Sequence, residues 1–427
     1  MRNINELRAE MESGMYDSRL KDIYVDEKMV PYNRERYVKA IDRFKELYRE
    51  EEVEIYSAPG RSEVCGNHTD HQNGHVLATS VNLDAIAIVT GTDDMTIHLV
   101  SDDMPEEIID ISDVERNADE EGTTKALIKG VVAGIEDYGY KIGGFKAYIT
   151  SDVLMGAGMS SSAAFESLIG TILSGLYNHM KISSVDIAKI GQYAENVFFG
   201  KPCGLMDQMA CAVGGLIYID FLDKANPVIK QVPCDFEANQ YSLCIVDTKG
   251  SHADLTDDYA AIPEEMRQVA KFFGKELLTE IMPSEFFSNI ALLRGHISDR
   301  AVLRAMHFYT EQARVDEGVK ALEANDFGRF LDVIRRSGDS SSKLLQNIYS
   351  TKDVHTQNVM VALGASEYFL GDEGVCRVHG GGFAGTIQAF VKNAAVDGYK
   401  NSIESIFGEG TCHVLKVRPY GGIKVIA

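Results

Sequence analysis

Hydrophobic positions along the chain follow a helical spacing in some regions and a strand-like spacing in others. In residues 34–51, Tyr37, Ile41, Phe44 and Leu47 recur every three or four positions, which places them on one face of a helix. Residues 1–30 carry a shorter and weaker version of this pattern, which favours a packed arm over an oligomer contact. The same spacing predicts helices over residues 125–138, 163–177 and 184–199, and a mostly helical region over 255–370.

Alternating or continuous apolar runs predict strands between these helices. They lie at residues 53–58, 85–90, 95–100, 145–151, 215–221, 241–248, 375–379, 385–391, 412–417 and 422–426. Because helices and strands are interleaved in both halves of the chain, the pattern predicts a two-domain α+β protein. No Pro- or Ser-rich linker marks a domain boundary. We place an N-terminal helical extension at 1–35, a first domain at 36–214 and a second domain at 215–427.

Composition and charge restrict the function. The chain has 427 residues, 45% of them hydrophobic and 25% charged, which excludes a disordered protein. Lys and Arg number 42 against 64 Asp and Glu, for a net charge of −22. Such a field repels phosphate backbones and anionic lipid, so we expect neither a nucleic-acid nor a membrane partner. An anionic substrate would need a local positive site.

Cysteine usage and the polar start of the chain point to a reducing compartment. The seven cysteines are scattered, with no CxxC pair, so neither a disulfide framework nor a zinc spacing emerges. No segment reaches the roughly 18 apolar residues that a membrane helix needs. We therefore expect a cytoplasmic protein with reduced thiols, either a monomer or a weak homo-oligomer.

Residues 155–164, MGAGMSSSAA, follow a predicted strand and open a predicted helix. Glycines let the backbone pass close to a ligand, and a helix N-terminus presents unpaired N–H groups to an anion. The three serines add hydroxyls for phosphate oxygens or magnesium. A tight turn with a serine cap is the alternative. The segment lacks both the GxxxxGK[ST] pattern and the GxSxG pattern.

Residues 60–75, GRSEVCGNHTDHQNGH, gather basic, acidic and imidazole side chains directly after a predicted strand. His and Asp are good zinc ligands, but the ligand spacing is incomplete and no second cluster follows. A polar pocket for a hydroxylated ligand suits the same residues, because Asp accepts hydroxyl bonds and His donates or accepts them. A polar surface turn is the third interpretation.

Residues 200–215, GKPCGLMDQMACAVGG, place Asp207 at the start of an apolar helix, beside Leu205, Met206 and Met209. An Asp at this position is most often a helix cap. Its apolar neighbours would dehydrate the carboxylate, which then needs a partner, and Arg61 is available as one.

Together these segments resemble the galactokinase family of the GHMP small-molecule kinases. PGRSEVCGNHTDHQNGH is similar to the sugar signature GRxNLIGEHTDYNGG, and MGAGMSSSAA to the phosphate loop GxGLSSSA. GKPCGLMDQ is similar to GxPCGIMDQ, and VHGGGFAGTI, residues 378–387, to the third motif GAGFGG. The resemblance runs from about residue 36 to the end. It implies a two-domain GHMP kinase fold with the active site in the interdomain cleft, and ATP-dependent phosphorylation of the anomeric hydroxyl of galactose or a close derivative.

The resemblance also implies a role for individual residues. Asp207 matches the catalytic aspartate that faces the C1 hydroxyl, and Arg61 the arginine that pairs with it. Ser162, with Ser161 as second choice, and Glu195 match the ligands of Mg²⁺, the cofactor expected beside ATP. The expected sugar-binding residues are Asn67, His68, Asp70, Gly204 and Tyr259. The expected ATP-binding residues are Gly156, Ala157, Gly158, Met159, Ser160, Ser161 and Ser162, and the residues expected to support the phosphate loop are Gly380, Gly381 and Gly382.

Two departures from the family signatures bear on the substrate. Asn67 stands where the family has a Glu that contacts the sugar C6 hydroxyl, and His71 replaces a Tyr. Ala384, in the third motif, is a mild change that does not threaten ATP binding. Loss of that carboxylate would remove about 4 kcal/mol of repulsion towards a uronic acid. Galacturonate is therefore an alternative to galactose. A non-catalytic sensor of sugar and ATP, or a metal-dependent hydrolase built on HTDH, are alternatives of other classes.

Overall fold

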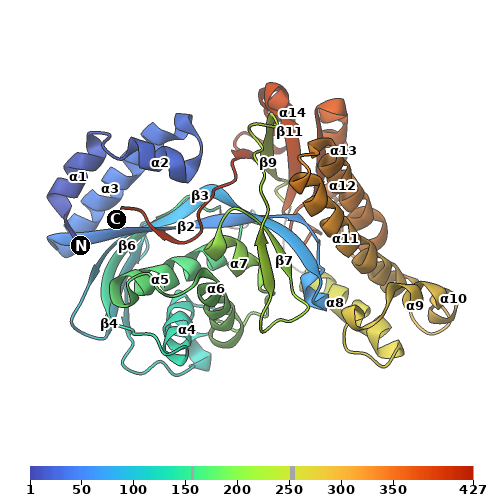
Figure 1. Cartoon of the computed structure of the whole chain (residues 1–427), viewed down its shortest axis with the longest axis horizontal. Helices are drawn as coiled ribbons and strands as arrows, with labels where there is room; N and C mark the ends of the chain where they lie inside the picture. The colour runs from blue at the N-terminus through green and yellow to red at the C-terminus, as the bar shows by residue number, and fades with distance from the viewer. Residues whose placement is uncertain (155–157, 251–254, 427) are drawn as a thin grey trace.

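The computed structural model describes residues 1–154, 158–250 and 255–426. Figure 1 shows the N-terminal half and the C-terminal half side by side, with both chain termini beside the N-terminal half. The helices are α1 (Ile4–Glu12), α2 (Asp17–Tyr24), α3 (Val30–Tyr48), α4 (Thr124–Asp137), α5 (Ser161–Asn178), α6 (Ser184–Tyr193), α7 (Met206–Val213), α8 (Thr256–Phe272), α9 (Pro283–Ser288), α10 (Ile290–Leu293), α11 (Asp299–Glu323), α12 (Phe327–Ser340), α13 (Asn358–Leu370) and α14 (Val396–Phe407).

The first sheet is built around two long antiparallel strands, β2 and β3, and runs in the order β1-β2-β3-β6-β4-β5. β13 also pairs with β2, and β7 pairs with β3 and with β8. Its strands are β1 (Arg2–Asn3), β2 (Glu52–Cys65), β3 (His75–Gly91), β4 (Thr96–Ser101), β5 (Glu107–Asp110), β6 (Phe145–Ser151), β7 (Leu216–Asp220), β8 (Val228–Gln231) and β13 (Ile423–Lys424). β7 and β8 lie beyond residue 214, so the first sheet extends past the boundary that we placed there, and this boundary stays a prediction.

Both faces of the first sheet are covered, which explains why its central strands β2 and β3 are buried at nearly every position. Val53 and Ile55 of β2 pack with α1, α2 and α3, while Tyr56 and Ala58 of the same strand pack with α4, α5 and α6. Successive side chains of a strand point to opposite faces, so one strand contributes to both cores. Residues 1–30 thus form a packed arm on the sheet, held also by the pairing of β1 with β2.

The second sheet has the order β10-β11-β9-β12. Its strands are β9 (Tyr241–Asp247), β10 (Gly374–Val378), β11 (Thr386–Lys392) and β12 (Cys412–Leu415). α13 and α14 pack on one side of it, and residues of α11 and α12 share a core with Leu243 and Phe390. The expected α+β fold is therefore confirmed. The first sheet is mixed, because β4 and β6 pair in parallel, and the second sheet is antiparallel.

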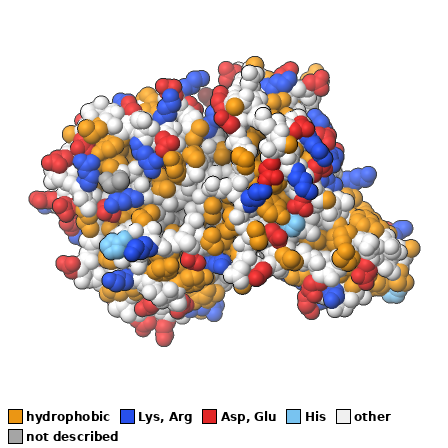
Figure 2. All heavy atoms as spheres, in the orientation of Figure 1, with side chains coloured by type: hydrophobic (Ala, Val, Ile, Leu, Met, Phe, Trp, Pro, Cys, Tyr) orange, Lys and Arg blue, Asp and Glu red, His pale blue; other side chains and the backbone are white. Residues whose placement is uncertain are grey.

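The surface agrees with a strongly charged protein. On the face shown in Figure 2, acidic and basic side chains of the described residues are interspersed with apolar ones. Every helix in the described ranges is too short or too polar to span a lipid bilayer.

Candidate active site

A cavity of about 1090 Å³ lies where the two halves of the chain meet. Its walls come from β2, the turn that follows β2, the start of α5, the start of α7, α8 and the loop between β10 and β11. A smaller recess of about 160 Å³ opens among Arg61, Glu63, His68, Asp70, Asp207 and Gly381. Most of the segments singled out in the sequence therefore meet at one place.

Arg61 and Asp207 form a bidentate ion pair in this cavity. Arg61 Nε donates to Asp207 Oδ1 at 2.7 Å, and Nη2 donates to Oδ2 at 2.6 Å. Arg61 comes from β2 at a bulge between Pro59 and Arg61, and Asp207 from the first turn of α7. The third guanidinium nitrogen donates to the carbonyl oxygen of Gly158. Such a fork fixes the orientation of the carboxylate as well as its charge.

The environment keeps Asp207 ionised. Burial alone would raise the pKa of Asp207, but the Arg61 guanidinium and a hydrogen bond from the Ser160 hydroxyl bring it below its usual value. Because 29% of the Asp207 side chain remains exposed, the carboxylate is still open to a ligand in the cavity. It can orient a hydroxyl group, while its low basicity makes it a weak acceptor of the proton.

The start of α5 forms another wall. Gly158 and Ser160 both have positive φ, +68° and +51°, and the helix begins at Ser161. A Cβ on Gly158 would lie 2.8 Å from Thr386 Oγ1, so glycine is needed where this loop meets the second sheet. Met159 is fully buried, and its carbonyl oxygen accepts from the Arg61 backbone N–H. The predicted ATP residues Gly156 and Ala157 lie outside the described residues.

Ser162 and Glu195 lie together beside the cavity. The Ser162 hydroxyl donates to Glu195 Oε1 at 3.2 Å, and the Lys201 ammonium donates to the same oxygen at 2.8 Å. Glu195 sits on a π-helical turn, Ala194–Phe198, that follows α6. Such turns are frequent at functional sites. A hydroxyl and a carboxylate are an oxygen-only donor set, which suits Mg²⁺.

A second carboxylate lies behind this pair. Glu166, one turn after Ser162 on α5, has a buried Oε1 with no hydrogen-bond partner among the described residues. Burial, followed by the charge of Glu195, raises the pKa of Glu166 well above its usual value. Gln208 Nε2 bridges the two carboxylates, at 3.1 Å from Glu166 Oε2 and 2.8 Å from Glu195 Oε2. An unsatisfied buried oxygen at this position supports the fit of a cation.

Four of the five expected sugar residues line the cavity: His68, Asp70, Gly204 and Tyr259. A Cβ on Gly204 would lie only 2.0 Å from Asp70 Oδ2, so glycine lets the Asp70 carboxylate approach α7. His68 Nε2 donates to the carbonyl oxygen of Gly381 at 3.1 Å, and burial lowers the pKa of His68 to about 3. His68 is therefore neutral at physiological pH.

Asn67 is the fifth, and it is turned away from the cavity into the protein. Its side chain is fully buried, and the amide Nδ2 donates to Glu63 and to the carbonyl oxygen of Gly380. Its Oδ1 accepts from Asn347 Nδ2 at 2.8 Å and from Ser341 Oγ at 3.4 Å. The amide thus has protein partners for both of its hydrogens and both acceptor positions.

The three glycines expected to support the phosphate loop occupy the turn after β10. Gly380 and Gly381 line the inner recess, and the carbonyl oxygen of Gly382 accepts from Tyr259 Oη at 2.8 Å. A Cβ on Gly382, at φ +79°, would lie 2.0 Å from the Asn347 carbonyl oxygen. This turn therefore borders the recess and contacts Tyr259 of α8.

The histidines of HTDH contact each other in the structure. Within residues 1–154, 158–250 and 255–426, no three His, Cys, Asp or Glu side chains are grouped so as to hold a metal ion. The His68 and His71 rings stack instead, with centroids 5.5 Å apart.

Sequence reasoning missed three residues of the site: Lys201, Glu166 and Glu63. Lys201 lines the cavity, and Glu63 lines its inner recess. Lys201 begins the segment that carries Asp207, and Glu63 lies two residues after Arg61. The positions of Lys201 and Glu63 within the motifs could have marked them as site residues, but the sequence does not show the direction of their side chains.

Comparison with known proteins identifies the family of the chain. Residues 126–215 match the model of the GHMP kinases N terminal domain, and residues 42–90 match the galactokinase galactose-binding signature. A galactokinase from Actinobacillus pleuropneumoniae serotype 3 (strain JL03) is 31% identical over 375 residues, which cover 87% of this chain and 94% of that protein. A galactokinase from Glaesserella parasuis serovar 5 (strain SH0165) is 32% identical, over 83% of this chain and 89% of that protein.

Two solved structures have the same fold. The crystal structure of Lactococcus lactis galactokinase complexed with galactose aligns with a TM-score of 0.76 at 23% identity, covering 90% of this chain and 98% of that one. A crystal structure of mevalonate kinase aligns with a TM-score of 0.59 at 17% identity, covering 85% and 99%. On the sequence matches, together with this fold, the chain belongs to the galactokinase family of the GHMP kinases.

Proposed function

We propose that the protein transfers the γ-phosphoryl group of ATP to the anomeric hydroxyl of galactose, or of a close galactose derivative. The observation that carries this proposal is the Arg61–Asp207 pair, which faces the same cavity as the N-terminus of α5. The cavity thus offers a carboxylate for a sugar hydroxyl and, beside it, backbone N–H groups at the helix N-terminus for phosphates.

Asp207 and Arg61 have the central roles in the proposed reaction. Asp207 accepts a hydrogen bond from the C1 hydroxyl and directs its oxygen at the γ-phosphorus. As the new O–P bond forms, the bond to the β–γ bridging oxygen breaks, and the hydroxyl proton passes to Asp207 late in the reaction. Arg61 stabilises the negative charge of the transferring group. Phosphoryl transfer has a loose transition state, so positioning and charge stabilisation suffice.

The residues around the start of α5 would hold the nucleotide. Gly158, Ser160 and Ser161 line the cavity where a phosphate meets the helix N-terminus, and the Lys201 ammonium lies nearby. Ser162 and Glu195 would hold Mg²⁺, which neutralises the charge of the β- and γ-phosphates when it is bound. The ion pair between Lys201 and Glu195 holds the carboxylate in place in the absence of Mg²⁺. These local positive features explain how a chain of net charge −22 can bind ATP.

Sugar-dependent ADP release, measured with a panel of hexoses, tests the proposal. We expect release with galactose and Mg²⁺, and a large loss of release in the Asp207→Asn variant. Binding of both galactose and ATP without turnover would instead identify a non-catalytic sensor. Stoichiometric zinc in the purified protein, with no ADP release, would favour a hydrolase. A cytoplasmic location and a monomeric or weakly oligomeric state stay predictions.

A further inference from the structure

Glu63 and Asn67 form a buried contact next to the sugar side of the cavity. The Asn67 amide donates to both carboxylate oxygens of Glu63, each at 3.1 Å. In the signature GRxNLIGEHTDYNGG, the positions of Glu63 and Asn67 carry Asn and Glu. The chain therefore keeps one carboxylate and one amide at these two positions, in reversed order.

The two side chains have different access to the cavity. Asn67 is fully buried, and its hydrogen-bonding capacity is used by Glu63, Gly380, Asn347 and Ser341. Glu63 is 3% exposed and lines the inner recess. Among the described residues, Glu63 Oε2 accepts only from Asn67, so it retains acceptor capacity towards a ligand.

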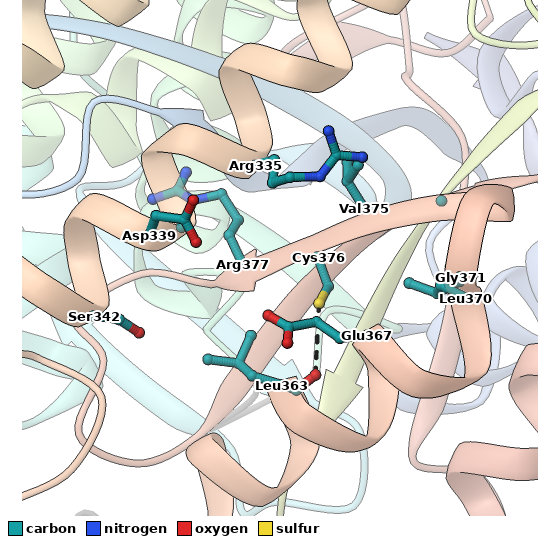
Figure 3. Close-up of a pocket in the computed structure, with 12 residues that line it drawn as sticks. Arg335, Asp339, Ser342, Leu363, Glu367, Leu370, Gly371, Val375, Cys376 and Arg377 are labelled. Atoms are coloured by element: carbon teal, nitrogen blue, oxygen red, sulfur yellow. Dashed lines mark hydrogen bonds between the residues drawn. The ribbon is translucent and has the colours of Figure 1, made fainter.

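Arg377 forms an ion pair with Glu63 and also borders a second cavity. Its Nη2 donates to Glu63 Oε1 at 2.9 Å, and the residue is fully buried on β10. Figure 3 shows Arg377 with Arg335 and Asp339 beside this second cavity, whose volume is about 340 Å³. Burial raises the pKa of Glu63, and the Arg377 guanidinium opposes that rise. Glu63 lines the recess and Arg377 does not, so a sugar in the recess would face the carboxylate.

We infer that Glu63 is a specificity-determining residue, which accepts a hydrogen bond from a sugar hydroxyl and selects a neutral hexose over a hexuronate. This inference rests on the proposed function, and it concerns a different carboxylate of the recess from that of Asp207. A carboxylate accepts from a hydroxyl but repels a second carboxylate in a site with little water. The negative charge that the Asn67 departure was expected to remove is therefore still present, two residues after Arg61.

The test compares galactose and galacturonate as substrates and as ligands. We expect wild-type kcat/KM to favour galactose by roughly 100-fold, given two like charges in a partly screened recess. Glu63→Gln should reduce that preference at least about tenfold, mainly through the KM of each sugar. Glu311→Gln is the matched control, because Glu311 is also buried and is bonded to Cys65 and Gly66 but lies outside the lining of the recess. It should leave the preference unchanged.

A loss of structure alone would lower both activities together and leave their ratio intact, so the ratio is the decisive measurement. If Glu63→Gln does not fold, the Glu63→Gln/Arg377→Gln variant removes both members of the ion pair and serves the same comparison. An unchanged ratio, or a wild-type enzyme that prefers galacturonate, overturns the inference. A wild-type protein that phosphorylates neither sugar contradicts the proposed function instead. In that case, calorimetry of galactose and galacturonate binding to the wild type and to Glu63→Gln would still test whether Glu63 selects between the two sugars.

Discussion

Arg61 and Asp207 are separated by 146 residues, yet two hydrogen bonds join the guanidinium to both oxygens of the carboxylate. One residue comes from a strand of the first sheet, and the other from the first turn of α7. The pairing holds Asp207 ionised and fixed in direction while it remains 29% exposed. A carboxylate in this state is suited to orienting a substrate.

Replacement of that carboxylate by an amide should stop turnover while leaving sugar binding nearly intact. We expect Asp207→Asn to lower kcat at least about 100-fold, because a neutral amide cannot accept the hydroxyl proton. Steady-state assays and calorimetry with galactose measure the two effects separately. Asp397→Asn, at an exposed position on α14, is the control and should leave both unchanged. Near-normal kcat in Asp207→Asn would refute the assignment.

A methyl group at residue 204 should weaken sugar binding without disturbing the fold. The new Cβ would lie 2.0 Å from Asp70 Oδ2, and that side chain would have to move out of the cavity. Loss of a hydrogen bond to a charged group corresponds to a rise in the KM for galactose of roughly tenfold or more. Gly364→Ala, where an added Cβ meets nothing within 4 Å, should leave KM unchanged. An unaltered KM in Gly204→Ala would mean that Asp70 does not contact the sugar.

Removal of the Glu195 charge should raise the demand for Mg²⁺. We expect Glu195→Gln to increase the Mg²⁺ concentration at half-maximal activity by about 10- to 100-fold, with partial rescue at high Mg²⁺. The readout is ADP release across a Mg²⁺ titration at fixed ATP, with the exposed Glu409→Gln variant alongside. A titration midpoint equal to that of wild type would remove Glu195 from the proposed metal site.

Asp84 should be important for stability, although it lies outside the cavity. It is fully buried and accepts from Tyr24 Oη at 2.8 Å, Arg36 Nη1 at 2.6 Å and Arg418 Nη1 at 2.8 Å. Asp84→Asn would leave two buried guanidinium groups without their shared counter-charge. We expect a loss of about 3–5 kcal/mol in the free energy of unfolding, measured by denaturant titration.

The partly exposed Asp152, 3.1 Å from Arg36, is the matched control for Asp84, and Asp152→Asn should cost no more than about 1 kcal/mol. The pH dependence follows from the sign of the pKa shift. Burial alone would raise the pKa of Asp84, but Arg36 and Arg418 lower it below its usual value. The contribution of Asp84 is therefore complete above the unfolded pKa of about 3.9, and is lost as pH falls through the lower folded pKa. Equal losses in both variants would contradict this account.

Most elements of the fold were predictable because their signals are local. The helix expected over residues 34–51 is α3, which begins earlier, at Val30, because Pro31 suits the first turn of a helix. The strand expected to end at residue 58 continues to Cys65. Pro59 and Gly60 interrupt its pattern, and pairing with β3 on both sides of a bulge carries the strand through them. Such pairing depends on residues distant in the sequence.

Most residues of the candidate site could be predicted from the sequence, but the directions of their side chains could not. Arg61 and Asp207 were candidates because of their neighbours in the sequence, and the resemblance to the galactokinase motifs implied the roles of Arg61, Asp207 and Ser162. The inward direction of Asn67 depends on Asn347 and Gly380, which are 280 and 313 residues away. No local pattern carries that information, so the direction of the Asn67 side chain could not be predicted from the sequence.

The pairing of β13 with β2 has a consequence for synthesis of the chain. Ile423 lies opposite Ser57, and Lys424 opposite Tyr56, on the same strand that carries Arg61. During translation the first half of the molecule leaves the ribosome long before these partners exist. One edge of β2 at Tyr56 and Ser57 therefore stays unpaired until residues 423 and 424 have been synthesised.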